Sequence, residues 1–181
     1  DNVGYIWDNE CNMKLRLAHL YPDHMNISGD RGNVLSLKQR CAWRGIELDI
    51  DAVGVAAKVD WDAVDIAFFG GGQDSGQALI ADDFVRHQGP SLRQAIEDGL
   101  VMLAICGGYQ MLGHYFLTHT NEKLPGIAAL DLHTVGGHVR LIGNIAVESD
   151  LMPWQTEEYG NRQTRVRLVG FENHSGRTYL G

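Results

Sequence analysis

The chain has 181 residues, 44% of them hydrophobic, which suffices for one hydrophobic core but hardly for two. The net charge of -8 and the absence of a lysine and arginine cluster argue against nucleic acid or an anionic membrane surface as the main partner, and favour a small polar ligand or another protein. The three cysteines fit neither a disulfide framework nor a CxxC metal pattern, so we expect a reducing, cytoplasmic environment.

Residues 1–12 show neither a helical nor a strand period, and we interpret them as an extension before a single domain at 13–181. From Met13 onward, short apolar runs alternate with helical patterns. This alternation is typical of βαβ units, so the sequence predicts an α/β fold around a mostly parallel sheet.

The expected elements follow the chain in a regular order up to residue 116. Strands are expected at residues 14–21, 46–53, 64–69 and 100–105, and helices at residues 33–45, 74–87, 90–99 and 107–116. By composition, the strand at 100–105 is expected to be the most buried. After Thr118 the period changes to two, at 138–149 and 164–176, which predicts antiparallel strands added to the sheet.

Cys106 follows the apolar run at 100–105 and precedes two glycines and a helical pattern. Strand, nucleophile, glycines and helix in this order form a nucleophile elbow, which holds the side chain at the carboxyl edge of the sheet. The helix N-terminus adds free N–H groups and partial positive charge, which stabilise a thiolate. We therefore interpret Cys106 as a nucleophile, with an inert buried cysteine as the alternative. Cys41 lies on the apolar stripe of an expected helix and is interpreted as a core residue.

A glycine loop at 70–72 ends the strand expected at 64–69. The backbone N–H groups of Gly71 and Gly72, together with that of Gly107, are expected to converge on one oxygen atom. Such an arrangement is an oxyanion hole, which stabilises the charge that develops when a nucleophile attacks a carbonyl. The alternative is a glycine turn that binds no ligand.

Five segments resemble the class I glutamine amidotransferases of the cobyric acid synthase type, and among them the glutaminase subunits of lipid II isoglutaminyl synthases. They are "DRGNVLSLKQR" (30–40), "FFGGGQD" (68–74), "AICGGYQMLG" (104–113), "VRLIGN" (139–144) and "GFENHSGRTYLG" (170–181). The resemblance implies a flavodoxin-like, three-layer fold and a Cys106 thioester with L-glutamine that releases ammonia. It also implies a MurT-like, ATP-dependent ligase as the partner in a heterodimer, which amidates the glutamate of the lipid II stem peptide in peptidoglycan synthesis.

The resemblance further implies that Arg140 binds glutamine. The strand pattern places Arg140 on the face opposite Val139 and Leu141. A guanidinium in this position can grip the α-carboxylate of glutamine in a bidentate way.

The resemblance places the catalytic histidine in a Tyr-Leu-His-Gly type segment downstream of "FENHSGRT". The sequence reaches Gly181 without such a segment, so we expect the domain to be C-terminally incomplete and the base to lie outside it. His174 is the rival candidate, because Glu172 is two residues away on the same strand face and can orient the imidazole. The alternative is a turn whose side chains cap backbone groups.

Six other histidines lie without a nearby acid pattern and are interpreted as surface or packing residues: His19, His24, His87, His114, His119 and His133. None has metal-ligand spacing, so we expect neither a metal nor a cofactor.

Two classes of function remain open. The first is an enzyme subunit, a glutaminase of the kind described, with an amidotransferase of the cobyric acid or cobyrinate type as the enzymatic alternative. The second is a noncatalytic, amidotransferase-like module that binds a partner ligase. The joint presence of Cys106, the glycine loop and Arg140 favours the glutaminase.

Overall fold

The computed structural model describes residues 13–27, 29–149 and 166–181, so the extension expected at 1–12 lies outside the described residues. The chain divides into two units, one comprising Asp1–Val135 with Thr178–Gly181 and the other Gly136–Arg177. The single domain expected from the sequence stays a prediction.

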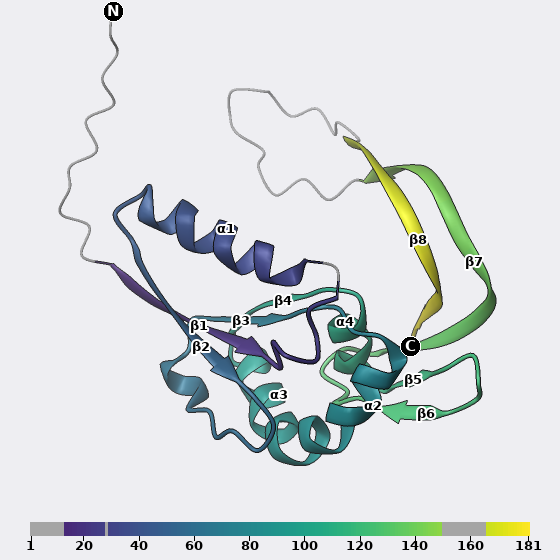
Figure 1. Cartoon of the computed structure of the whole chain (residues 1–181), viewed down its shortest axis with the longest axis horizontal. Helices are drawn as coiled ribbons and strands as arrows, with labels where there is room; N and C mark the ends of the chain where they lie inside the picture. Colours follow the sequence, from purple (N-terminus) through teal and green to yellow (C-terminus); the bar gives the residue numbers. More distant parts are fainter. Residues whose placement is uncertain (1–12, 28, 150–165) are drawn as a thin grey trace, which may run out of the picture. The chain divides into compact units, whose positions relative to one another are not determined.

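A four-stranded parallel sheet forms the centre of the first unit (Figure 1). Its strands, in the spatial order β2-β1-β3-β4, are β2 (Glu47–Val53), β1 (Lys14–Leu20), β3 (Ile66–Phe69) and β4 (Val101–Ala104). The register sets Leu17 of β1 beside Ile50 on one side and Ile66 on the other. All four strands lie where the apolar runs predict them, and the parallel α/β sheet is confirmed.

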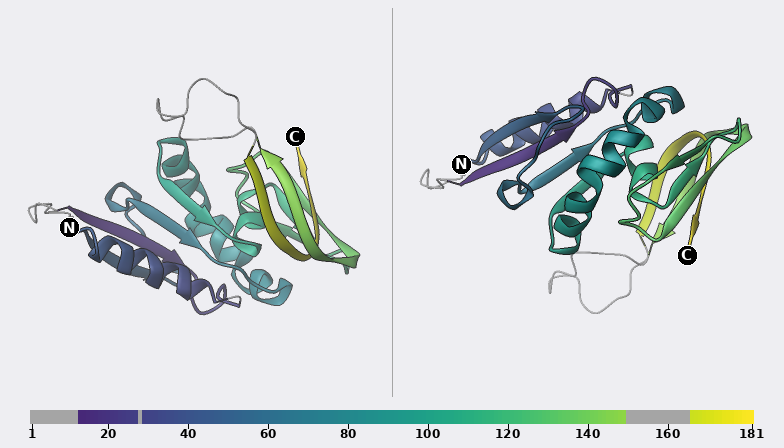
Figure 2. Two further views of the ribbon diagram at one scale, coloured as in Figure 1. Left: turned by 90° about the horizontal axis from the view of Figure 1, so that it is seen from above. Right: turned by 90° about the horizontal axis from the view of Figure 1, so that it is seen from below.

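Helices cover both faces of this sheet (Figure 2). On one face α1 (Asp30–Ala42) packs Val34 against Leu17 and Phe68. On the other face lie α2 (Asp74–Asp83), the π-helical turn η2 (Phe84–Gln88) and α3 (Gly89–Glu97). Among the described residues, no helix combines the length and the apolar character needed to cross a bilayer.

The two helices expected at 74–87 and 90–99 are joined by η2 into one helical segment. Pro90 lies in the first turn of α3, where the missing N–H removes no hydrogen bond of that helix. A proline at this position therefore does not separate the two helices.

The helix expected at 107–116 is shorter than predicted, because α4 spans Gly107–Leu112 and Tyr115–Leu117 form strand β5. Gly113 leaves the helical conformation, with φ -77° and ψ -168°. The next residue, His114, donates its N–H to Leu132 O at 2.8 Å. Pairing with a distant segment therefore overrides the helical period of residues 113–116.

The prediction that the strand at 100–105 is the most buried is wrong. In β4, Val101 is 61% exposed and Leu103 is 39% exposed. The reason is the strand order, because β4 is an edge strand and pairs with β3 alone among the described strands of this sheet. Composition reports hydrophobicity, but the position in the sheet decides burial.

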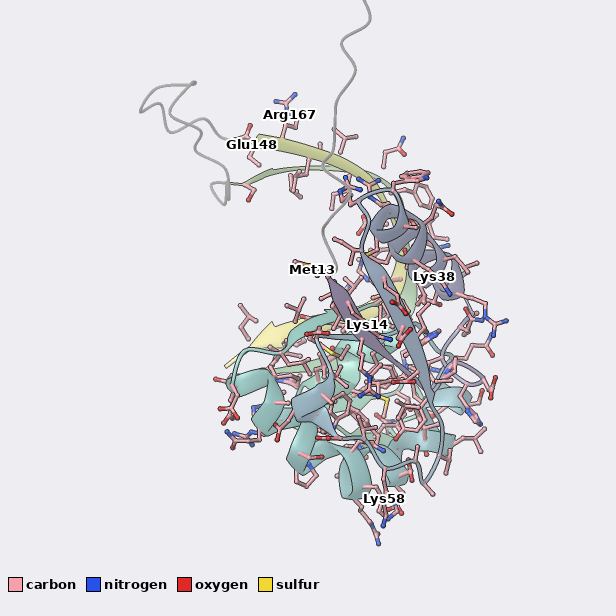
Figure 3. The ribbon with its side chains drawn as sticks, turned by 90° about the vertical axis from the view of Figure 1, so that its left-hand side faces the viewer. Met13, Lys14, Lys38, Lys58, Glu148 and Arg167 are labelled. Carbon is pink, nitrogen blue, oxygen red and sulfur yellow. The ribbon has the colours of Figure 1, made fainter. Side chains whose placement is uncertain are left out.

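Exposed ion pairs line one face of β1 and β2. Lys14, visible at the start of β1 in Figure 3, lies 2.8 Å from Asp49 and 3.2 Å from Glu47. Arg16 lies 2.8 Å from Asp51. Water screens such pairs, so they contribute little to stability and mark a solvated face.

A second sheet has the order β6-β5-β7-β8. Besides β5, it contains β6 (Lys123–Pro125), β7 (Leu132–Ser149) and β8 (Val166–Leu180). The residue numbers of β7 and β8 run in opposite directions, because Thr134 hydrogen-bonds to Thr178 and Arg140 hydrogen-bonds to Asn173. The antiparallel strands expected in the C-terminal third are therefore present, whereas β5 pairs with β7 in parallel.

Candidate active site

Cys106 occupies a strained turn between β4 and α4. It is the N-cap of α4 and has φ 51° and ψ -111°. A residue with a side chain held at such a positive φ typically costs about 1–3 kcal/mol. Cys106 is exposed, so the burial assumed in the alternative interpretation is wrong. The elbow geometry predicted from the sequence is present, and Cys41 packs partly buried against the core cluster under α1, as expected.

Glycines allow the elbow and the glycine loop to touch through their backbones. A Cβ on Gly108 would lie 2.6 Å from Phe69 O and 2.8 Å from Gly70 O, which is too close for any side chain. A Cβ on Gly107 would lie 3.0 Å from Gly72 N. The turn at Cys106 and the loop at 70–72 therefore form one contiguous backbone surface.

Four successive carbonyl groups, from the last residue of β3 through the loop at 70–72, accept hydrogen bonds. Their donors are Ile105 N–H to Phe69 O (2.9 Å), Gly108 N–H to Gly70 O (3.1 Å), Ile27 N–H to Gly71 O (3.3 Å) and Gln77 Nε2 to Gly72 O (3.3 Å). Because each trans peptide is planar, a fixed carbonyl also fixes the direction of the next N–H. Within the described ranges, no backbone hydrogen bond outside helices and strands is donated by the N–H of Gly71, Gly72 or Gly107.

A buried carboxylate lies beside the same loop, and the sequence analysis missed it. Asp30, the first residue of α1, is 1% exposed. A Cβ on Gly71 would lie 3.7 Å from Asp30 Oδ2 and 3.3 Å from Cys106 Cβ. Asp30 and Cys106 therefore flank the same glycine, although they are 76 residues apart in the sequence. An acidic residue at the start of a helix is so common that the sequence alone does not single it out.

The loop between β1 and α1 borders the glycine loop on its other side. The buried Met25 packs against Gly72, and Ile27 holds Gly71 O. A surface depression of about 310 Å³ lies on this loop, lined by Pro22, Asp23, His24, Asn26, Ile27 and Arg31. Cys106 is not among the lining residues, so the depression neighbours the candidate site without containing the thiol.

His19 is a packing residue, as expected. It is 4% exposed and packs edge-on against Phe68. Burial, and after it the nearby Arg31, lowers its pKa.

Three other histidines lie close to a carboxylate. His87 lies 2.8 Å from Asp83, His114 lies 2.9 Å from Asp131, and His119 lies 3.6 Å from Asp74. The expectation that these three have no nearby acid is therefore wrong.

Arg140, Glu172 and His174 lie in the second unit, whereas Cys106, Gly71, Gly72 and Gly107 come together in the first. Arg140 is exposed and donates from Nε and Nη2 to Asn173 of β8.

The Glu172 and His174 pair lies within the continuous strand β8, so the alternative of a turn is wrong. His174 Nε2 lies 3.1 Å from Glu172 Oε2, which confirms the shared strand face. His174 Nδ1 lies 2.8 Å from Gly176 O. Both ring nitrogens therefore already face acceptors on their own strand.

Comparison with known proteins identifies a glutamine amidotransferase domain and several similar proteins. The model of the CobB/CobQ-like glutamine amidotransferase domain matches residues 16–181. The GatD subunit of lipid II isoglutaminyl synthase (glutamine-hydrolyzing) from Staphylococcus aureus is 38% identical over 166 residues, which cover 92% of this chain and 63% of GatD. The same subunit from Streptococcus pneumoniae is 37% identical over 174 residues, which cover 96% of this chain and 62% of GatD.

A probable cobyric acid synthase from Methanopyrus kandleri is 36% identical over 92 residues, which cover 48% of this chain and 17% of that protein. The chain thus spans less than two thirds of the length of both GatD relatives.

Proposed function

Since the chain belongs to the CobB/CobQ-like glutamine amidotransferase domain family, we propose that it is a glutaminase that uses Cys106 as its nucleophile. One observation carries this proposal, the strained elbow of Cys106 packed against the glycine loop. A residue keeps a conformation that costs about 1–3 kcal/mol only where the surroundings enforce it, and such residues cluster at active sites. A noncatalytic binding module has no use for that strain.

In the proposed reaction, the Cys106 thiolate attacks the side-chain amide carbon of glutamine. The new C–S bond pushes the carbonyl electrons onto oxygen, and the N–H groups of Gly71 or Gly72 and of Gly107 stabilise this oxyanion. Each such donor typically contributes about 2.7–4 kcal/mol. Collapse of the intermediate breaks the C–N bond, and the departing nitrogen takes a proton to leave as ammonia. Water then hydrolyses the thioester to glutamate and restores the thiol.

Proton transfer requires a histidine that approaches Cys106, and we propose that Asp30 orients it. The buried carboxylate flanks the same glycine as the nucleophile, which is where the acid of a cysteine triad is needed. His174 is a poor base, because both of its ring nitrogens already face acceptors on β8. Arg140, exposed on a strand, is proposed to bind the α-carboxylate of glutamine.

The ammonia acceptor is proposed from the relatives. Both GatD proteins match more than nine tenths of this chain, whereas the cobyric acid synthase matches about half of it. We therefore propose that a MurT-like, ATP-dependent ligase partner uses the ammonia to amidate the lipid II stem-peptide glutamate. Amidation of cobyric acid precursors is the second candidate.

The test is covalent capture followed by turnover. A glutamine analogue that carries an electrophilic carbon should label Cys106 before Cys41, as mapped by peptide mass spectrometry, and Cys106→Ala should abolish that labelling. Glutamate release is then measured with and without the ligase partner, and lipid II is compared with a cobyrinate as acceptor. Labelling of Cys41 first, or equal slow labelling of both thiols, would contradict the proposal and favour the binding module.

A further inference from the structure

Gln77 of α2 connects the glycine loop to the helix that begins at the nucleophile. Its side chain is 1% exposed. Its Nε2 atom donates to Gly72 O at 3.3 Å and to Gln110 Oε1 of α4 at 3.1 Å. A Cβ on Gly107 would lie 2.8 Å from the same Nε2 atom, so this amide packs directly behind the nucleophile turn.

The direction of the Gln77 amide follows from its partners. Gly72 O can only accept a hydrogen bond, so the NH₂ end of Gln77 faces it. The second N–H then meets Gln110 Oε1, and both donors of the amide are used. One side chain thereby ties the loop at 70–72 to α4.

Stability alone does not explain a glutamine at this position. Gln77 Oε1 is buried and has no hydrogen-bond partner among the residues that the structure describes. A buried acceptor without a donor typically costs about 1–3 kcal/mol, whereas an apolar side chain of similar shape avoids this cost. This cost offsets much of what the two hydrogen bonds of Nε2 contribute to stability, so we look for a purpose of the amide besides stability.

We propose that Gln77 is a positioning residue of the oxyanion hole, a role that rests on the glutaminase function proposed above. By holding Gly72 O and Gln110 together, it fixes the position of the last residue of the glycine loop relative to the helix that carries Gly107. The N–H groups of Gly72 and Gly107 thereby keep their separation while charge develops on the substrate oxygen. A displacement of about 1 Å in such a site can cost about 100-fold in rate. The loss falls on the transition state, so kcat decreases more than KM increases.

The experiment compares Gln77→Met with Gln88→Met in the protein together with its ligase partner. Gln88 is a matched control, because it is 2% exposed and its Nε2 donates to one backbone carbonyl, Ala57 O, at 2.6 Å. We expect Gln77→Met to lower kcat about 10- to 100-fold, with KM changed less than about threefold. Its melting temperature should fall no further than that of Gln88→Met, because the substitution also removes the unpaired Oε1. Gln88→Met is expected to lower the melting temperature and to change kcat less than about threefold.

Gln110→Met provides a second measurement of the same link, because Gln110 is only partly buried and tolerates substitution. It should lower kcat by a smaller factor than Gln77→Met, and the double variant should be no slower than Gln77→Met alone. If Gln77→Met does not fold, the effect of Gln110→Met on kcat decides: a decrease at unchanged KM supports the link, and no change overturns it.

The outcomes separate the two proposals. A wild-type protein that neither captures the glutamine analogue on Cys106 nor releases glutamate overturns the glutaminase function, and the role of Gln77 with it. An active wild type in which Gln77→Met and Gln88→Met have the same kcat overturns the positioning role alone.

Discussion

Replacing Cys106 by glycine should stabilise the protein relative to the alanine variant. Cys106 has φ 51°, a conformation that typically costs a residue with a Cβ about 1–3 kcal/mol and costs glycine almost nothing. Glycine loses about 0.5–1 kcal/mol through its greater freedom in the unfolded chain. The side chain is exposed, so its removal sacrifices little packing. The difference leaves Cys106→Gly more stable than Cys106→Ala by about 0.5–2 kcal/mol.

Cys106→Ala is the reference because it keeps the Cβ and the strain but lacks the thiol. Urea unfolding with equal m-values should show the difference as a shift in midpoint. In a protein of this size, about 1 kcal/mol corresponds to about 2–4 °C in melting temperature. Both variants should fail to react with the electrophilic glutamine analogue, so they differ in stability but not in capture.

The reasoning is refuted if the glycine variant is the less stable of the two by about 0.5–1 kcal/mol, the ordinary penalty for glycine in regular structure. Equal stability of the two variants would also count against it, because the strain would then be too small to need an explanation from function.

Three further predictions concern other parts of the chain. Gly108→Ala should abolish capture of the glutamine analogue, because its Cβ would collide with two backbone carbonyls. The control Gly32→Ala lies in open space on α1, so it should add about 0.5–1 kcal/mol of stability and leave capture unchanged. Equal capture by both variants would contradict this. Arg140→Ala should weaken glutamine binding while changing the melting temperature little, because Arg140 is exposed; unchanged affinity with a lower melting temperature would make it structural. Burial opposes the charge of Asp83, but hydrogen bonds from Tyr21 and its other partners outweigh this and lower its pKa below 3.8. A carboxyl whose pKa is lowered in the folded state stabilises the protein above pH 3.8, and this contribution is lost as the pH falls. Tyr21→Phe should therefore lower the free energy of unfolding at neutral pH by about 1–3 kcal/mol and weaken its dependence on pH below 3.8. Parallel curves of unfolding free energy against pH for the two proteins would contradict this.

Local chemistry made much of the fold predictable. Apolar residues locate β1 to β4. β3 is apolar throughout and mostly buried, as expected for a central strand of a parallel sheet, whereas β1 and β2 alternate apolar residues with the charged residues of their exposed face. The elbow was predictable for a similar reason, since strand, Cys106, two glycines and helix are adjacent in the chain and need no distant contact to be recognised.

The local sequence pattern gave wrong predictions where pairing with a distant segment decides the secondary structure or the burial. Residues 115–117 form strand β5 and not part of the expected helix, because β5 pairs with β7. Strand β4 is exposed because it lies at the edge of the parallel sheet. In both cases a tertiary contact outweighs a weak local preference.

The sequence by itself determined the elbow at Cys106, the glycines that follow it and the order of the apolar runs, because neighbouring residues encode each of these features. Only the tertiary structure decided that Asp30 and Gln77 belong to the same site. Asp30 reaches Gly71 through the packing of α1 on one face of the sheet, and Gln77 reaches Gly72 and Gln110 from α2 on the other. Such contacts join elements that are far apart in the chain, and no period of two or 3.6 residues encodes which elements will meet.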